Sequence, residues 1–373
     1  MIMAYLGEEI KKLGFGMMRL PRIDGEIDIE QSKKMVDIFM NAGFTYFDTA
    51  YVYGGSEEAV KKSLVERYPR ESYQLATKMA AWVNNGNDVT NQLEESLKRT
   101  GAGYFDFYLM HNLGEDRTKQ YEKLGIWEYL AKKKSEGIIK HIGFSFHSTA
   151  DDLDTILTNH PEAEFVQLQI NYADWESSKI QSRACYEVAR KHNKPVIIME
   201  PVKGGLLANP PKNIEEIFKS AEPQASCASW AVRFAADLDG VIAVLSGMST
   251  EQQVRDNVSY MKDFTHLTDE QRGVLKKARE EFMKIPSIPC TSCDYCAKVC
   301  PKNIGLSGSC TAMNLELVYG NTAQAKAREK QFTVNSEKKR ASDCIKCGKC
   351  EKVCPQHIHI REELERVANT LID

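Results

Sequence analysis

The sequence lacks several features that mark membrane, secreted or nucleic-acid-binding proteins. No apolar run in its 373 residues approaches the roughly 20 residues that a helix needs to cross a bilayer. Residues Met1–Lys12 show no basic segment followed by a long apolar one, so we expect no signal peptide and a cytoplasmic location. The net charge of −3 gives no electrostatic reason to expect binding to nucleic acid or to an anionic membrane.

The composition is that of a globular protein with an unusual placement of cysteine. Apolar residues make up 42% of the chain and charged residues 27%. Of the 11 cysteines, eight lie in two short clusters near the C-terminus. In a chain without an export signal, this distribution argues for metal ligation over disulfides. The other three, Cys185, Cys227 and Cys310, are expected to be small buried apolar side chains.

Short apolar runs alternate with amphipathic segments from Leu13 to about Gly247. This pattern predicts parallel strands that are buried on both faces. Eight runs predict an α/β fold of the (β/α)8 TIM-barrel type, which needs about 250 residues. A doubly wound sheet is less favoured because no run is followed by a Gly-x-Gly-x-x-Gly fingerprint. The runs are Phe15–Met18, Thr45–Asp48, Gln74–Lys78, Phe105–Met110, His141–Ser145, Phe165–Ile170, Pro195–Glu200 and Val241–Ser246.

Amphipathic segments between the runs predict the barrel helices, and two prolines predict where the barrel ends. Pro286 and Pro289 follow the last amphipathic segment and break the helical pattern. We therefore predict a barrel domain over residues 1–284 and a mostly helical second domain over 285–373. In the second domain, Ser309–Tyr319 is expected to be helical and Asn321–Arg340 a solvated helix or loop. The segments between the runs are Ile29–Asn41, Glu57–Arg67, Val89–Arg99, Tyr121–Lys134 and Ile180–His192, and a final amphipathic segment, Thr268–Met283, follows the last barrel helix.

Both cysteine clusters have the spacing C-x2-C-x2-C-x3-C-P, which is the bacterial [4Fe–4S] signature. In two-cluster ferredoxins the fourth cysteine of each run ligates the other cluster. We therefore predict two [4Fe–4S] clusters in a helical ferredoxin-like domain. Zinc knuckles are the alternative, but zinc gives no reason for the doubled rhythm or the trailing proline. The predicted ligands are Cys290, Cys293, Cys296 and Cys354 for one cluster, and Cys344, Cys347, Cys350 and Cys300 for the other.

Four polar side chains lie at or just after consecutive strand ends in the first half of the chain. They are Asp48, Tyr53, Lys78 and His111. Singly, each has an ordinary structural explanation, such as a surface charge, a loop cap or a rim histidine. Together they indicate a catalytic site, because barrel enzymes place their chemistry at the carboxyl ends of the strands.

The chemistry of these four residues is complementary. Tyrosine is a weak acid with an ordinary pKa near 10, and a nearby ammonium group favours its phenolate form. A buried lysine needs an anion to stay charged. We therefore interpret Asp48 and Lys78 as a relay that makes Tyr53 a general acid, with His111 donating a hydrogen bond to a substrate carbonyl.

These motifs resemble the aldo/keto reductase superfamily. The resemblance runs from Leu13 to about Tyr260 and includes Phe47–Ala50 with Tyr53 and Gly54, Ala76–Lys78, and Met110–His111. The second domain resembles the branch that carries a ferredoxin-type iron–sulfur domain. The resemblance implies a nicotinamide cofactor, NADP or NAD, and a small carbonyl or alcohol substrate.

The resemblance also implies the cofactor contacts. Gly247 and Gln253 stand where NADPH-preferring members usually place Lys and Arg, so the sequence leaves the choice between NADP and NAD open. Met199 stands where many members stack an aromatic ring. The implied contacts are Ser145 and Gln167 at the carboxamide, Met199 at the nicotinamide, Glu200, Pro201, Val202, Lys203 and Gly204 at the pyrophosphate, and Gly247, Met248, Ser249, Gln253 and Asn257 at the adenosine phosphate.

The sequence supports two functions of different classes. The first is an NAD(P)-dependent carbonyl–alcohol oxidoreductase with Tyr53 as the acid. The second is an electron-transfer protein whose clusters pass single electrons to a redox partner protein, while the barrel binds a nucleotide, a flavin or a partner. A hydride carries two electrons and a cluster accepts one, so direct coupling would need a flavin, for which the sequence shows no motif. Clusters that only stabilise the fold or sense redox state are a third alternative.

Overall fold

The computed structural model describes residues 5–83, 89–114, 116–178 and 180–372, so residues 1–4 of the N-terminal segment lie outside it. The chain forms two compact units. One contains Met1–Val202 and Ala228–Asp269, and the other contains Lys203–Cys227 and Glu270–Asp373. The segment Lys203–Cys227 thus leaves the first unit between two of its elements. The predicted domain boundary at residues 284 and 285 stays a prediction.

The first unit is a closed barrel of eight parallel strands, so the predicted (β/α)8 fold is confirmed. Each strand pairs with its neighbours in chain order, and β10 closes the ring by pairing with β1. A short antiparallel pair, β2 (Arg22–Ile23) and β3 (Glu26–Ile27), precedes the first helix. The barrel strands are β1 (Leu13–Gly16), β4 (Tyr46–Asp48), β5 (Gln74–Met79), β6 (Phe105–Leu113), β7 (Ile139–Phe146), β8 (Phe165–Gln169), β9 (Val196–Met199) and β10 (Val241–Ser246).

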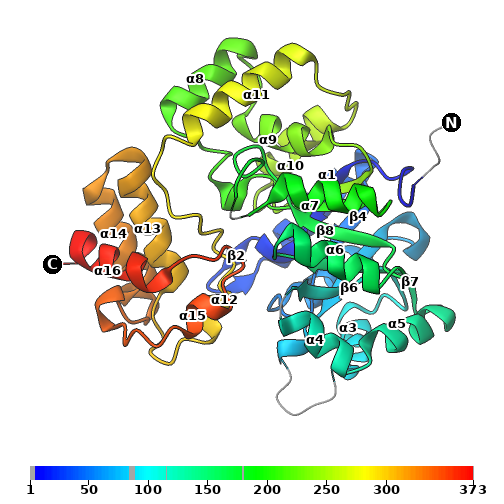
Figure 1. The fold of residues 1–373 in the computed structure, drawn as a ribbon. Helices are drawn as coiled ribbons and strands as arrows, with labels where there is room; N and C mark the ends of the chain where they lie inside the picture. The colour runs from blue at the N-terminus through cyan, green and yellow to red at the C-terminus, as the bar shows by residue number, and fades with distance from the viewer. Residues whose placement is uncertain (1–4, 84–88, 115, 179, 373) are drawn as a thin grey trace. The chain divides into compact units, whose positions relative to one another are not determined.

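Helices connect the strands of the first unit (Figure 1). The segment predicted over Ile29–Asn41 is helix α1, and Asp28 caps it by accepting the Gln31 N–H at 3.0 Å. The segment predicted over Tyr121–Lys134 is interrupted, because Gly125 has a φ of 63°. The helices are α1 (Ile29–Asn41), α2 (Ser56–Val60), α3 (Asn91–Thr100), α4 (Asp116–Lys123), α5 (Ile126–Ser135), α6 (Ala150–Asn159), α7 (Ser182–Lys191), α9 (Cys227–Ala236) and α10 (Glu251–Met261).

The barrel interior holds a layer of buried apolar side chains that includes Tyr46, Ala76, Leu109 and Phe165. Side chains on a strand alternate between its two faces. The next inward position on each of these four strands lies two residues closer to its carboxyl end. Those positions are occupied by Asp48, Lys78, His111 and Gln167, and all four are buried. The alternation of the strands therefore places polar chemistry directly above an apolar floor.

The second unit is helical. Helix α13 packs against α14 and α16 around buried side chains such as Leu306, Met313 and Leu364 (Figure 1). The Tyr319 hydroxyl donates to the Asn209 carbonyl at 2.5 Å, which ties the segment Lys203–Cys227 to α13. The helices are α8 (Lys212–Ala221), α11 (Asp269–Phe282), α12 (Tyr295–Lys298), α13 (Leu306–Tyr319), α14 (Thr322–Phe332), α15 (Lys349–Lys352) and α16 (Ile360–Leu371).

Candidate active site and cluster pockets

Asp48 and Lys78 form a buried ion pair across adjacent strands β4 and β5. Lys78 Nζ lies 2.5 Å from Asp48 Oδ1 and 2.7 Å from the Thr49 carbonyl oxygen. Burial raises the pKa of Asp48 and lowers the pKa of Lys78, and the contact between the two groups opposes both shifts. Burial therefore works against both charges, and each group depends on the other to stay ionised.

Tyr53 and His111 lie beside this pair. Lys78 Nζ is 5.1 Å from the centre of the Tyr53 ring. The Tyr53 and His111 rings meet edge to face with their centres 5.9 Å apart. The structure thus brings together all four side chains that the sequence predicted at the strand ends. The phenol of Tyr53, the ammonium group of Lys78 and the imidazole of His111 thus lie next to one another.

Two further aromatic residues shape the site and were missed by sequence reasoning. The half-buried Trp82 ring lies 5.2 Å from the His111 ring, edge to face. The buried Tyr121 hydroxyl accepts the His111 backbone N–H at 3.1 Å and lies 2.9 Å from the Met79 carbonyl oxygen. Tyr121 therefore fixes the ends of β5 and β6 relative to each other. The only sequence signal for the burial of Tyr121 is its position in a predicted amphipathic segment.

A second buried acid, Glu57, contacts Thr77, the residue before Lys78. Sequence reasoning did not identify it as part of the site. The Thr77 hydroxyl donates to its carboxylate at 2.8 Å, and Arg99 forms an ion pair with it at 3.3 Å. Burial raises the pKa of Glu57, and these contacts act in the opposite direction. The negative charge of Glu57, like that of Asp48, raises the pKa of Lys78.

The two residues expected at a nicotinamide carboxamide, Ser145 and Gln167, lie on adjacent strands, and Asn112, which was not expected there, lies beside Ser145. Ser145 accepts the Asn112 N–H at 2.7 Å, and Gln167 Nε2 lies 3.4 Å from Asp48 Oδ2. Gln167 Oε1 and Asn112 Oδ1 are buried and have no hydrogen-bond partner among the residues that the structure describes. A carboxamide NH2 group would satisfy such acceptors, so these residues fit a nicotinamide. Met199 ends β9 beside Gln169.

The predicted pyrophosphate residues are divided between the two units. Glu200, Pro201 and Val202 belong to the barrel unit, and the Glu200 carboxylate pairs with Arg19 at 3.7 Å. Lys203 and Gly204 belong to the second unit. Glu200 and Lys203 both have positive φ angles, of 56° and 49°, so the backbone turns sharply here.

The predicted adenosine-phosphate residues surround the start of α10. Gln253 accepts the Ser249 N–H at 2.7 Å, and the buried Asn257 donates to the Ser246 hydroxyl at 2.6 Å. Met248 is buried. The Arg19 side chain lies against Gly247, where an added Cβ would be 3.2 Å from Arg19 Cδ. Sequence reasoning missed this contact, in which the aliphatic part of the Arg19 side chain reaches the motif from the other end of the chain.

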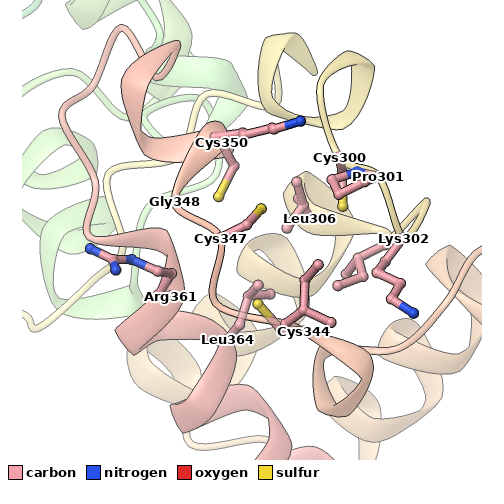
Figure 2. Close-up of a pocket in the computed structure, with 13 residues that line it drawn as sticks. Cys300, Pro301, Lys302, Leu306, Cys344, Cys347, Gly348, Cys350, Arg361 and Leu364 are labelled. Carbon is pink, nitrogen blue, oxygen red and sulfur yellow. The ribbon is translucent and has the colours of Figure 1, made fainter.

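The eight clustered cysteines line two separate pockets in the second unit, in the crossed arrangement that the sequence predicted. Cys300 lines one pocket with Cys344, Cys347 and Cys350 (Figure 2). Cys354 lines the other with Cys290, Cys293 and Cys296. The open space at the two pockets, including adjoining solvent, is about 330 and 370 Å³. Among the described residues, no three His, Cys, Asp or Glu side chains converge as ligands of a single metal ion.

Two features of the cluster pockets were not predicted. Leu306 lines both, so the pockets are neighbours. Cys185, Cys227 and Cys310 are buried as expected. However, Cys310 also lines the pocket of Cys290. It is therefore a neighbour of a predicted ligand and not only a core side chain.

Among the helices of the described residues, none combines the length and the apolar composition that crossing a bilayer requires.

Comparisons with known proteins agree with this architecture. The model of the aldo/keto reductase family matches residues 12–280, and the model of the 4Fe-4S dicluster domain matches residues 289–359. An aldo-keto reductase of Strobilurus tenacellus is 30% identical over 221 residues, which are 56% of this chain and 62% of that protein. A probable aldo-keto reductase of Glycine max is 30% identical over 180 residues, which are 45% of this chain and 50% of that protein. The chain thus spans only about half to three fifths of the length of these two relatives.

Solved structures share the barrel. An aldo-keto reductase from Klebsiella pneumoniae in complex with NADPH superposes with a TM-score of 0.59 at 21% identity, covering 73% of this chain and 92% of that one. An aldo-keto reductase from Bacillus halodurans gives 0.60 at 23% identity, covering 74% and 95%. At these identities the likeness shows the fold alone. The match of the family model over most of the chain shows more: this protein belongs to the aldo/keto reductase family of oxidoreductases and carries a 4Fe-4S dicluster domain after the barrel.

Proposed function

We propose that this protein is an NAD(P)-dependent oxidoreductase that interconverts a carbonyl and an alcohol, and that it also carries two [4Fe–4S] clusters. The observation that carries the proposal is the buried Asp48–Lys78 pair, whose ammonium group lies 5.1 Å from the Tyr53 ring. A fold does not need an ion pair this deeply buried, because desolvation offsets its attraction. Its use is to support ionisation at Tyr53.

The residues then divide the chemistry among them. A bound reduced nicotinamide supplies the hydride. Tyr53 gives its proton to the carbonyl oxygen, so that one hydride and one proton convert the carbonyl to an alcohol. His111 holds that oxygen, and Trp82 beside it limits access of water. Gln167 and Asn112 supply acceptors for the carboxamide, which would fix the face of the ring that meets the substrate.

The proposal that the protein binds a nicotinamide nucleotide is also supported by its similarity to solved structures. The Klebsiella neighbour was solved with NADPH, and the residues that would contact the carboxamide here, Asn112, Ser145 and Gln167, lie on β6, β7 and β8. Four-cysteine pockets fit either zinc or an iron–sulfur cluster, and the dicluster family match supports iron–sulfur clusters. Iron and acid-labile sulfide analysis of the purified protein tests the clusters directly.

A second candidate function is single-electron transfer through the clusters. The observation that favours it is Leu306, which lines both pockets and makes the two clusters neighbours. Closely spaced clusters suit passage of electrons one at a time. In this case the barrel would bind a nucleotide, a flavin or a partner without reducing a carbonyl.

Anaerobic titration of protein with fully loaded clusters separates the two functions. NADPH and NADH are added with and without a probe carbonyl such as 4-nitrobenzaldehyde. The reductase proposal expects nucleotide oxidation only when the carbonyl is present, with unchanged cluster absorbance. Bleaching of the clusters by nucleotide alone, with no carbonyl-dependent oxidation, would favour electron transfer. Repeating the titration with added FMN tests whether a flavin couples the two.

A further inference from the structure

The two cluster pockets differ in charge. The pocket of Cys344 is lined by three basic side chains, Lys302, Lys349 and Arg361, and by no acidic one. The pocket of Cys290 is lined by Asp294 and by no basic side chain. The chain as a whole has a net charge of −3, so the basic lining of the first of these pockets is a local feature. Figure 2 shows Lys302 and Arg361 on opposite sides of the four cysteines.

The same pocket also lies at the surface. Cys347 is the one exposed side chain among the eight cysteines of the two pockets. Its neighbour Ile345 is 56% exposed, which makes it one of the few large apolar side chains that the second unit turns outward. Protein interfaces surround an apolar centre with a polar rim, and Ile345 would supply such a centre here.

Two of the surrounding cations are available to a partner. Arg361 pairs with Glu351 at 2.8 Å, and Lys346 pairs with Glu365 at 3.0 Å. Lys302 and Lys349 are exposed, and neither has an ion-pair partner among the described residues. Their charges therefore project into solvent beside Cys347 and Ile345.

We propose that the surface formed by Lys302, Ile345, Cys347 and Lys349, here called the Cys347 face, is the docking site of a small acidic protein that carries single electrons. The lysines would attract an acidic partner and orient it, and Ile345 would supply the apolar contact. The exposed Cys347 would bring the edge of the bound cluster next to the partner. Weak redox encounters of this kind need only a small interface. The proposal rests on the clusters of the proposed function but not on its carbonyl chemistry.

The test measures binding of an oxidised flavodoxin, an acidic one-electron carrier, to the cluster-loaded protein by calorimetry. We expect binding that weakens at least tenfold when ionic strength rises from about 0.05 M to about 0.3 M, because screening shortens the reach of surface charges. The double variant Lys302→Glu/Lys349→Glu should weaken binding at least tenfold at the lower ionic strength. Ile345→Ser should weaken it severalfold with an unchanged salt dependence.

The matched control is Lys276→Glu/Lys277→Glu on α11. Both lysines are exposed, neither lines a cluster pocket, and the change in net charge is the same. The control should bind flavodoxin within twofold of wild type. Iron content is measured first, and if the glutamate variant has lost iron, Lys302→Gln/Lys349→Gln replaces it.

Three outcomes would overturn the proposal. One is absence of flavodoxin binding to protein with a full iron content. Another is equal weakening by the two double variants, which would show an effect of net charge only. The third is equally tight binding of cytochrome c, a basic one-electron carrier. Because iron content is established beforehand, each outcome refutes the docking site without bearing on the clusters or on carbonyl reduction.

Discussion

The buried Asp48–Lys78 pair allows the sharpest prediction, because each partner leaves an uncompensated charge when the other is removed. We expect Asp48→Asn and Lys78→Met each to lower the free energy of unfolding of the barrel by about 3–5 kcal/mol. The double variant should be much less destabilised than the sum of the two, since it leaves no buried charge. Lys33→Met, which removes an exposed partner of Glu30 on α1, should cost less than about 1 kcal/mol.

The effect of these variants on the catalytic rate follows from the distance between Lys78 and Tyr53. With Lys78 Nζ 5.1 Å from the Tyr53 ring centre, an ammonium group stabilises negative charge there by about 3 kcal/mol at an effective dielectric constant of about 20. Loss of that stabilisation corresponds to roughly two powers of ten in rate. Both single variants and the double variant should therefore reduce a probe carbonyl about a hundredfold more slowly, while the double variant regains stability.

Urea unfolding followed by tryptophan fluorescence measures the stability, because all four tryptophans lie in the barrel unit. Carbonyl-dependent oxidation of NADPH measures the rate. Additive destabilisation in the double variant would refute the argument from uncompensated charge. Wild-type turnover in Asp48→Asn would refute the need for a charged Lys78.

Three further predictions concern other parts of the molecule. Burial would raise the pKa of Glu164, but bonds from His141, Lys134 and the Ile142 N–H outweigh it and lower the pKa to about 2. The carboxylate should therefore add about 3 kcal/mol of stability above pH 4.5, lost as pH falls toward 2. Urea unfolding of Glu164→Gln across this range should show a deficit that shrinks on acidification, and a constant deficit would contradict it. Arg19→Gln should weaken NADPH binding about tenfold and NADH binding less, because the aliphatic part of Arg19 packs on Gly247 and the variant removes the positive charge of this side chain. Arg22→Gln is its control, and equal losses for both nucleotides would exclude a role at the 2′-phosphate. Cys310→Ala should keep full iron, because the pocket that Cys310 lines already holds the four cysteines that a [4Fe–4S] cluster needs. Loss of iron would instead make Cys310 a ligand.

The sequence predicted the barrel and the grouping of Asp48, Tyr53, Lys78 and His111, because both follow from the pattern of strands and strand ends. Strand alternation alone places Asp48 two residues beyond Tyr46, and Lys78 two beyond Ala76, on the inner face. Cysteine spacing likewise indicated the crossed sets, because chain geometry limits which thiolates can share a cage. The ends of the eight predicted strands lie within a few residues of the observed ends.

The residues that sequence reasoning missed act across the fold. Trp82 meets His111 from the loop after a different strand, and Arg19 meets Gly247 from the far end of the chain. No periodic pattern encodes such contacts. The grouping of Lys203–Cys227 with the second unit was unexpected for the same reason, because it depends on contacts such as that of Tyr319 with Asn209. Cys310 fits both a core position and a cluster neighbour, and only its place in the pocket separates the two.

The most direct test of the central claim is the behaviour of Tyr53→Phe. This variant keeps the ring beside Lys78 and His111 and removes only the hydroxyl group that would donate the proton. General acids contribute roughly 10²–10⁴ in rate, so carbonyl reduction with NADPH should fall at least a hundredfold. Nucleotide affinity and iron content should stay within twofold of wild type. Carbonyl reduction at the wild-type rate by Tyr53→Phe would contradict the account.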